Sequence, residues 1–310
     1  MTIQLHRRAL GGLALAAGLP AMARAQGAWP NAPVRIVVPF GAGGAVDTLS
    51  RAVANGFGPR ANGQAIVVEN RSGAGGTIAG QFVAQSRPDG ATIMMADLGA
   101  NAIGKILQPS LAYDPATAFA PIIHLVNLPI VVIVRTESSV RTLDDLVAAA
   151  RGKPDGLTYA SPGVGHVSHL AAELLARRAG VRFTAVHYRS GADVLRSLLA
   201  GETDFTFPSV STALPFIREG KARAIAIGTP RPVPALPGVP AVAATYAGFE
   251  AMTWHGIVGP AGMDPALVQQ INGVFRAIIT SPDVKTFVEE RQAAEVVANS
   301  FEDLADRLGC

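Results

Sequence analysis

Short apolar runs alternate with amphipathic stretches along most of the chain. Val34–Pro39 is a β-branched run of the kind that is buried on both faces of a parallel sheet. A glycine-rich turn follows, and then a helical stripe made by Leu49, Val53 and Phe57. Ala65–Val68 begins a second unit of the same kind. The pattern predicts an α/β fold with a mostly parallel sheet or sheets.

Further strands and helices are expected beyond these two units. The apolar runs that predict strands are Ile122–Val126, Ile130–Val134, Leu157–Ala160, Ala185–Tyr188, Phe205–Phe207 and Ala222–Ile227. Capping signals predict where helices start, at Thr142 with Asp145, Ser190 with Asp193, Ser300 with Asp303, Asp264-Pro265 and Ser281-Pro282. Helix ends are expected beside Gly180, Gly201 and Gly220.

Two breaks in this pattern suggest that the chain crosses twice between domains. One break lies at Val126–Pro129, and the other extends from the proline-rich stretch Pro230–Pro240 to Phe249. We therefore expect residues 26–127 and 250–310 to form one lobe, with residues 128–249 as a second, inserted lobe. A cleft between the lobes would then hold a ligand.

Residues 1–25 have the pattern of a secretory signal. His6-Arg7-Arg8 is the positive start, Ala9–Leu19 the apolar run, and Ala23-Arg24-Ala25 a small-residue cleavage site. The apolar run is too short to span a membrane, which takes about 20 residues. The sequence predicts cleavage after Ala25 and export to the periplasm. The general secretory route is favoured, and the paired arginines leave the twin-arginine route open.

Charge and cysteine content exclude several classes of function. Three of the 26 basic residues lie in the signal, which leaves 23 to balance the 23 acidic residues. A neutral body gives no electrostatic reason to expect nucleic acid or an anionic membrane surface. Cys310 is the only cysteine, so no intramolecular disulfide forms and no lipid anchor follows the cleavage site. The role of Cys310 stays open.

One motif occurs twice, a strand followed by Gly-Ala-Gly-Gly and then a helix. The two copies are Gly41–Gly44 and Gly73–Gly76. Glycine lets the backbone approach a ligand closely, and the following helix points unpaired N–H groups toward phosphate, sulfate or carboxylate. Two such turns on neighbouring strands predict a site for one anion. The alternative is that the glycines only make tight turns.

Other phosphate and hydrolase motifs are incomplete. A dinucleotide-binding loop needs a third glycine where Val46 and Ile78 stand, and no Gly-Lys-Ser/Thr sequence occurs. The sequence Tyr159–Gly163 around Ser161 lacks the first glycine of a serine-hydrolase elbow. No cofactor is therefore expected.

The histidines and one aspartate are weighed individually. His166 and His169 are three apart at a helix start without a supporting third ligand, so capping or packing is favoured over metal binding. Hydrogen-bonded core positions are expected for His124, His187 and His255. Asp204 precedes a strand, where it could face the cleft and receive an amine or hydroxyl, or form a turn.

The chain resembles the Bug-type extracytoplasmic solute receptors, the TctC-like substrate-binding components of tripartite tricarboxylate transporters. The resemblance runs from about residue 30 to the C terminus. Its motifs are Pro33–Phe40 with Gly43-Gly44 and Asp47, Val68–Arg71 with Gly73–Gly76, Pro88–Gly90, Tyr159–Ser161 with Gly163, Gly165 and His169-Leu170, Gly201 with Asp204, Gly220–Ala224, Leu236–Pro240, and Trp254–Gly256 with Pro260–Gly262.

The resemblance implies a two-lobed, type II-like periplasmic-binding-protein fold that closes on a small organic carboxylate. It also implies delivery to the membrane subunits of a tripartite tricarboxylate transporter, and we expect a monomer. The implied ligand-binding residues are Gly43, Gly44, Ala45 and Asp47 in the first loop, Ala74, Gly75, Gly76 and Thr77 in the second, and Ser161, Gly163, Gly165 and His166 from the opposite lobe, with Asp204 behind them.

Three departures from the family pattern change the expected site. Val46 stands where a hydroxyl residue is common, His166 where serine is common, and Ser190 where glycine is usual. The first two change the polarity of the pocket, so the sequence leaves open which carboxylate is bound and whether it carries an amine or an aromatic ring.

Two other functions are weighed against transport. An exported α/β enzyme could use His166 or Asp204 as a base, but no nucleophile, base and orienting group occur together. A sensory receptor that reports ligand occupancy to a membrane regulator would have the same fold and stays open.

Overall fold

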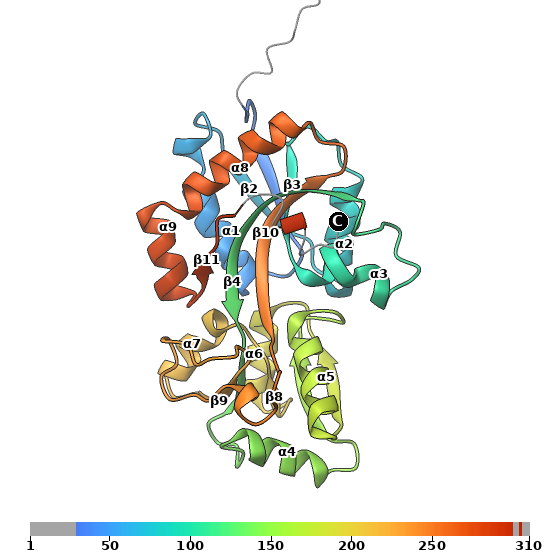
Figure 1. Cartoon of the computed structure of the whole chain (residues 1–310), viewed down its shortest axis with the longest axis vertical. Coiled ribbons are helices and arrows are strands. Elements are labelled where there is room, and N and C mark those ends of the chain that lie inside the picture. Colours follow the sequence, from blue (N-terminus) through green and yellow to red (C-terminus); the bar gives the residue numbers. More distant parts are fainter. Residues whose placement is uncertain (1–28, 300–303, 306–310) are drawn as a thin grey trace, which may run out of the picture.

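Two lobes, each built on one sheet, make up the protein (Figure 1). The computed structural model describes residues 29–299 and 304–305. The sheet of the first lobe has the order β11-β4-β10-β3-β1-β2. Its strands are β1 (Val34–Val38), β2 (Ile66–Asn70), β3 (Thr92–Ala96), β4 (Phe119–Pro129), β10 (Met252–Pro260) and β11 (Glu295–Val296).

The second lobe contains a five-stranded sheet of order β7-β6-β8-β5-β9. Its strands are β5 (Val131–Arg135), β6 (Leu157–Ser161), β7 (Phe183–His187), β8 (Phe205–Thr206) and β9 (Ala222–Ile227). The helices of this lobe are α4 (Leu143–Arg151), α5 (Val167–Ala179), α6 (Gly191–Ala200) and α7 (Val210–Arg218).

Helices also cover the sheet of the first lobe. They are α1 (Ala45–Asn55), α2 (Thr77–Ala84), α3 (Gly104–Leu107), α8 (Pro265–Ile279) and α9 (Pro282–Thr286). Leu49 and Val53 of the expected apolar stripe are fully buried on α1, and Phe57 is buried in the same core just beyond the end of this helix. Of the helices in the described residues, none has both the length and the apolar character that crossing a membrane requires.

Strands β4 and β10 connect the two lobes. They pair antiparallel along their whole length, from Phe119 opposite Pro260 to Pro129 opposite Met252. Both extend between the upper and lower lobes of Figure 1, in opposite directions, and only Ile130 separates the end of β4 from the start of β5. The expected lobe boundaries, 127/128 and 249/250, fall at this double crossing and stay a prediction.

The two-lobed α/β fold expected from the sequence is confirmed, with sheets that are mixed. β1 runs parallel to β2 and β3, and β6 runs parallel to β7 and β8. β10 runs antiparallel to β3 and β4, and β5 runs antiparallel to β8 and β9, so the sheets are not mostly parallel. The apolar runs expected to be strands did not include β3, β10 or β11, although His255 of β10 had been assigned to the core.

Local capping signals are confirmed where they can be seen, with one exception. Thr142 and Asp145 form a reciprocal capping box, and the side chains of Ser190 and Asp264 cap α6 and α8. The Ser281 hydroxyl instead donates to the carbonyl oxygen of Ile278. The signal segment 1–25, the Ser300–Asp303 cap and Cys310 lie outside the described residues.

Candidate functional site: a pocket between the lobes

Loops at the carboxyl ends of β1, β6, β7 and β8 bring the two lobes into contact. The backbone N–H of Gly41, after β1, donates to the carbonyl oxygen of Arg189, after β7, at 3.1 Å. The ring of Phe40 meets the imidazole of His166 edge-on, with the ring centroids 5.1 Å apart. The lobes are therefore closed on each other along this edge.

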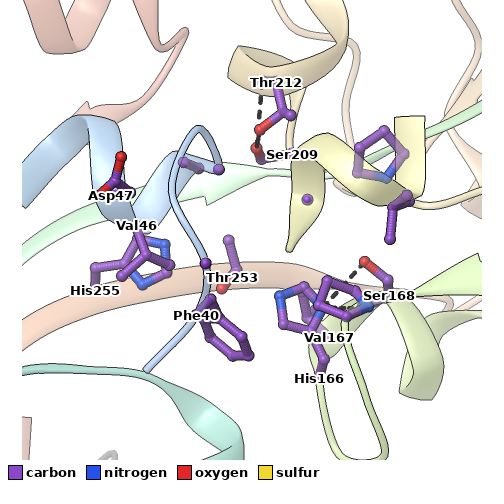
Figure 2. A pocket seen from close by; sticks show the side chains of 17 residues that line it. Phe40, Val46, Asp47, His166, Val167, Ser168, Ser209, Thr212, Thr253 and His255 are labelled. Carbon is purple, nitrogen blue, oxygen red and sulfur yellow. Dashed lines mark hydrogen bonds between the residues drawn. The ribbon is translucent and has the colours of Figure 1, made fainter. Parts of the chain in front are cut away.

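A cavity of about 40 Å³ lies between these loops (Figure 2). The first lobe contributes Phe40, Gly44, Ala45, Val46, Thr253 and His255 to its wall. The second lobe contributes Pro162, His166, Ser168, Gly191, Ser209 and Thr212. This volume has room for only two or three water molecules, so an organic solute has to enter while the lobes are apart.

The N terminus of α1 forms one wall of the cavity without a side-chain cap. Gly44 is the capping residue, and within the described part of the chain no side chain accepts from the first turn of α1 at this position. The other three helices that start at the pocket are capped by His166, Ser190 and Ser209. Unpaired N–H groups and the partial positive charge of α1 therefore favour an anion there.

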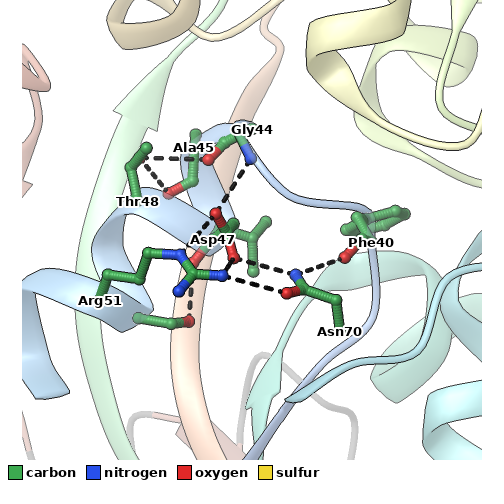
Figure 3. A network of polar contacts seen from close by, with 10 residues as sticks. Phe40, Gly44, Ala45, Asp47, Thr48, Arg51 and Asn70 are labelled. Atoms are coloured by element: carbon green, nitrogen blue, oxygen red, sulfur yellow. Dashed lines mark hydrogen bonds and ion pairs between the residues drawn. The ribbon is translucent and has the colours of Figure 1, made fainter. Parts of the chain in front are cut away.

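Asp47 holds the loop that precedes α1 in place (Figure 3). Its carboxylate accepts from the backbone N–H of Gly43 at 3.0 Å, from Asn70 at 2.9 Å and from Arg51 at 3.0 Å. Asn70 also donates to the carbonyl oxygen of Phe40 at 2.9 Å. Burial alone would raise the pKa of Asp47, but these hydrogen bonds and the Arg51 charge outweigh it and keep the pKa low. The carboxylate thus supports the loop.

Two histidines, the half-buried His166 and the buried His255, line the cavity in their neutral form. Burial, together with the nearby His255 and His169, lowers the pKa of His166 to about 3. Burial also lowers the pKa of His255 to about 4, an effect that the Ala96 backbone partly offsets. The Nδ1 atom of His166 accepts from the backbone N–H of Ser168 at 3.1 Å. Neither imidazole supplies a positive charge at neutral pH.

The second glycine loop faces a different space. Ala74, Gly75 and Thr77 line a larger chamber of about 580 Å³, together with Gly163 and Arg189. Gly75 lies against the opposite lobe, because a Cβ atom added at Gly163 would be 3.0 Å from the Gly75 Cα. The second loop therefore lines this chamber, whereas Gly41 and Gly44 of the first loop line the smaller cavity.

Gly43, Gly76 and Gly165 lie beside these spaces and do not line the smaller cavity. A Cβ atom added at Gly43 would be 3.3 Å from the Cβ of Ala192, at the flank of α6. One added at Gly76 would be 3.1 Å from the Cβ of Pro39, inside the first lobe. The N–H of Gly165 donates to His169 Nδ1 at 3.3 Å, which shapes the start of α5.

Ser161 and Asp204 have structural partners. The Ser161 hydroxyl is buried and bonds to the backbone of Gly163, with the oxygen atoms 3.0 Å apart. Asp204 accepts from the N–H of Thr158 at 2.8 Å and pairs with Lys153 at 3.4 Å. It lies before β8, whereas the pocket residues Pro208 and Ser209 follow that strand. The structure therefore does not bring Asp204 to the cavity.

Sequence reasoning missed part of the wall of the cavity. Thr253 and His255 are two residues apart on β10, so they share a face, and both line the cavity. That spacing was the available signal, but His255 was assigned to the core. His187 was expected to be buried, yet it is exposed and lines the larger chamber. In the described ranges, no group of three or more His, Cys, Asp or Glu residues could hold a metal ion.

Comparison with known proteins identifies relatives along nearly the whole chain. The family model described as "Tripartite tricarboxylate transporter family receptor" (TctC) matches residues 49–307. The UPF0065 protein in the tcbD-tcbE intergenic region of a Pseudomonas sp. strain is 35% identical over 97% of this chain and 92% of its own length. BugT of Bordetella pertussis is 29% identical over 87% of this chain and 83% of its own length.

Solved structures have the same fold. The periplasmic binding protein BugD has a TM-score of 0.85 and 31% identity, covering 91% of this chain and 94% of its own. An R. palustris protein solved with adipate has a TM-score of 0.86 and 32% identity, with the same coverage. MatC from Rhodopseudomonas palustris, with bound malate, has a TM-score of 0.84 and 30% identity, covering 91% and 98%. The chain belongs to the tripartite tricarboxylate transporter family of receptors, and it shares its two-lobed fold with the periplasmic binding protein BugD.

Proposed function

We propose that this protein is a periplasmic receptor that captures a small organic carboxylate between its lobes and delivers it to the membrane subunits of a tripartite tricarboxylate transporter. The observation that carries the proposal is the uncapped N terminus of α1 in the wall of the interlobe cavity. Adipate and malate in two related structures support a carboxylate ligand.

Catalysis is not part of the proposed function. The Nδ1 atom of His166 is engaged as the cap of α5, and Asp204 is bound to Thr158 and Lys153. Neither group is therefore placed to act as a base on a solute in the cavity. We propose that the receptor works as a monomer, without metal or cofactor, and releases its ligand unchanged.

The binding test is a calorimetric titration of the purified mature protein with mono-, di- and tricarboxylates, run beside their neutral amides. The proposal expects at least one acid to bind while its amide does not, before and after treatment with a chelator. Binding of amides as tight as that of acids would contradict it. So would the appearance of a chemically changed product.

Export and delivery need separate tests. Mass spectrometry of periplasmic protein is expected to find a mature chain that begins at Gln26, and an intact chain that starts at Met1 would contradict the proposed cleavage. Uptake of the identified acid is expected to require both this receptor and the membrane subunits. Uptake that persists when the membrane subunits are deleted would contradict delivery to that transporter.

A further inference from the structure

His255 is a buried polar side chain whose ring makes no well-formed hydrogen bond to the described residues, although the Ala96 backbone interacts with it. It is only 2% exposed and lies on β10 at the wall of the interlobe cavity, which Val46 and Asp47 also line (Figure 2). Among the described residues, no group makes a well-formed hydrogen bond to either ring nitrogen of His255. Buried polar atoms are nearly always paired, so one that lines a cavity indicates a partner supplied from outside the chain.

The other histidine that lines the cavity, His166, has a hydrogen-bond partner within the protein. His166 accepts from the N–H of Ser168 through Nδ1, which places its ring proton on Nε2. Its ring is also fixed by the edge-on contact with Phe40. In His255 only the Ala96 backbone is known to interact with the ring, and neither nitrogen makes a well-formed hydrogen bond to the described residues, so a ligand can still bond to it.

The charges around the cavity limit what that ligand can carry. Within the described residues, no lysine or arginine lines this cavity. Asp47 is paired with Arg51 and supports the loop. The favourable place for a negative charge is the uncapped N terminus of α1, which suits one carboxylate. A second carboxylate beside His255 would be buried without a cation, which is costly.

We propose that His255 determines the specificity of this receptor by hydrogen-bonding an uncharged hydroxyl or oxo group of a compact monocarboxylate. The inference rests on the proposed function, because it assumes that the carboxylate lies at α1. A neutral imidazole can donate through one nitrogen and accept through the other, so it can pair with a hydroxyl or with a carbonyl oxygen. The cavity of about 40 Å³ in the closed lobes suits a ligand of few atoms.

The test compares acids that differ in one group. Wild-type protein is titrated calorimetrically with propanoate, 2-hydroxypropanoate and 2-oxopropanoate, and with the four-carbon equivalents of these three acids. The dicarboxylates malate and adipate are titrated for comparison. The inference expects the hydroxy or oxo acid to bind at least tenfold more tightly than the plain acid, and more tightly than malate or adipate. A binding site that contains a buried polar group binds a ligand poorly when the ligand leaves that group without a hydrogen bond.

Two substitutions isolate the role of His255. His255→Leu is expected to reduce binding of the hydroxy or oxo acid at least tenfold and to change binding of the plain acid less than threefold. His255→Gln keeps donor and acceptor atoms and is expected to restore at least part of the discrimination. His187→Ala, at an exposed position in the other chamber, is the matched control and should bind as the wild type does.

A pH series separates a neutral partner from a charged one. The titratable groups that interact with the His255 ring are His166 and His124, and Asp47, which is paired with Arg51, lines the same cavity. With an uncharged partner at His255, affinity should stay within threefold from pH 6 to 8. A carboxylate at His255 would favour the charged imidazole, and affinity would rise steadily as the pH falls.

Three results would contradict the proposed role of His255. Tighter binding of malate or adipate than of every monocarboxylate would overturn this inference and leave the proposed function standing. An equal loss of affinity for all of the acids in His255→Leu, with the fold shown to be intact by circular dichroism, would also overturn it. Binding of no carboxylate at all would overturn both.

Discussion

Gly44 and Gly191 bring the N termini of α1 and α6 into backbone contact across the two lobes. A Cβ atom added at Gly44 would lie 3.6 Å from the backbone nitrogen of Gly191, and one added at Gly191 would lie 3.5 Å from the Gly44 Cα. Both helix ends carry a partial positive charge, so their approach is unfavourable by itself. A carboxylate bound beside them would offset this repulsion and favour the closed lobes.

Gly44→Ser should weaken carboxylate binding without harming the fold. The backbone of Gly44 is extended, with φ of −82°, so a serine fits and its hydroxyl would accept from the first turn of α1. That hydroxyl would compete with the ligand for the same N–H groups. We expect at least a tenfold loss of affinity, and a change of only a few tenths of a kcal/mol in the free energy of unfolding.

Calorimetry and urea unfolding check this expectation. Gly273→Ser is the control, because Gly273 lies on α8 with nothing within 4 Å of an added Cβ atom. Unchanged carboxylate affinity in Gly44→Ser would show that the ligand does not use the N terminus of α1.

Gly41→Ala should hinder closure of the lobes. An added Cβ atom would lie 2.9 Å from the Cβ of Ser190 and 3.3 Å from the carbonyl oxygen of Arg189, both in the opposite lobe. The substitution leaves the first lobe unstrained but keeps the lobes slightly apart. We expect small-angle scattering to give a larger radius of gyration than wild type in saturating ligand, with at least threefold weaker binding. If Gly41→Ala and the wild type had the same radius of gyration in saturating ligand, Gly41 would not be needed for closure of the lobes.

Gly76→Ala should destabilise the fold more than it affects binding. Gly76 has φ of 96°, which an L side chain rarely adopts, and its neighbours Pro39 and Ala100 belong to the same lobe. We expect urea unfolding to show a loss of roughly 1–3 kcal/mol. Affinity measured on the folded protein should stay within threefold. A large loss of affinity at unchanged stability would place the ligand at the second glycine loop.

The free energy of unfolding should fall as the pH rises from about 4 to 6, because the buried carboxyl of Asp97 titrates in this range. Burial raises the pKa of Asp97 to about 6 from an ordinary value of 3.8, against the hydrogen bonds from Ala100 and Gly99. In that range the folded state holds a proton that the unfolded state has lost, so folding is favoured at the lower pH.

Asp97→Asn removes this titration. The wild type should therefore lose roughly 1–3 kcal/mol more stability than Asp97→Asn between pH 4 and 6, measured by urea unfolding at several pH values. Parallel stability curves for the two proteins would show that the Asp97 carboxyl titrates normally.

Local sequence signals predicted the elements well because they depend on neighbouring residues. The capping box at Thr142, the apolar stripe of α1 and the glycine turn before Ala45 each involve contacts within a few residues. Strand direction and the pairing of β4 with β10 depend on contacts between distant segments, and the sequence patterns left both undetermined.

The candidate site was only partly predictable, because it too depends on contacts between segments that are distant in the sequence. The repeat of Gly-Ala-Gly-Gly suggested two loops around one anion, but packing of the lobes places Gly75 against Gly163 and directs the second loop to another chamber. The apolar surroundings of His255 predicted its burial correctly. They could not show that its nitrogens make no well-formed hydrogen bond to the described residues, because hydrogen bonding depends on which groups the fold brings near.

The location of the carboxylate tests the central claim most directly. It can be measured in a crystal structure of the mature protein with the acid that binds most tightly in the titrations. The account predicts carboxylate oxygens within hydrogen-bonding distance of the backbone N–H groups of Ala45 and Val46, between the two lobes. A carboxylate bound instead in the chamber beside Gly75 and Arg189 would contradict it.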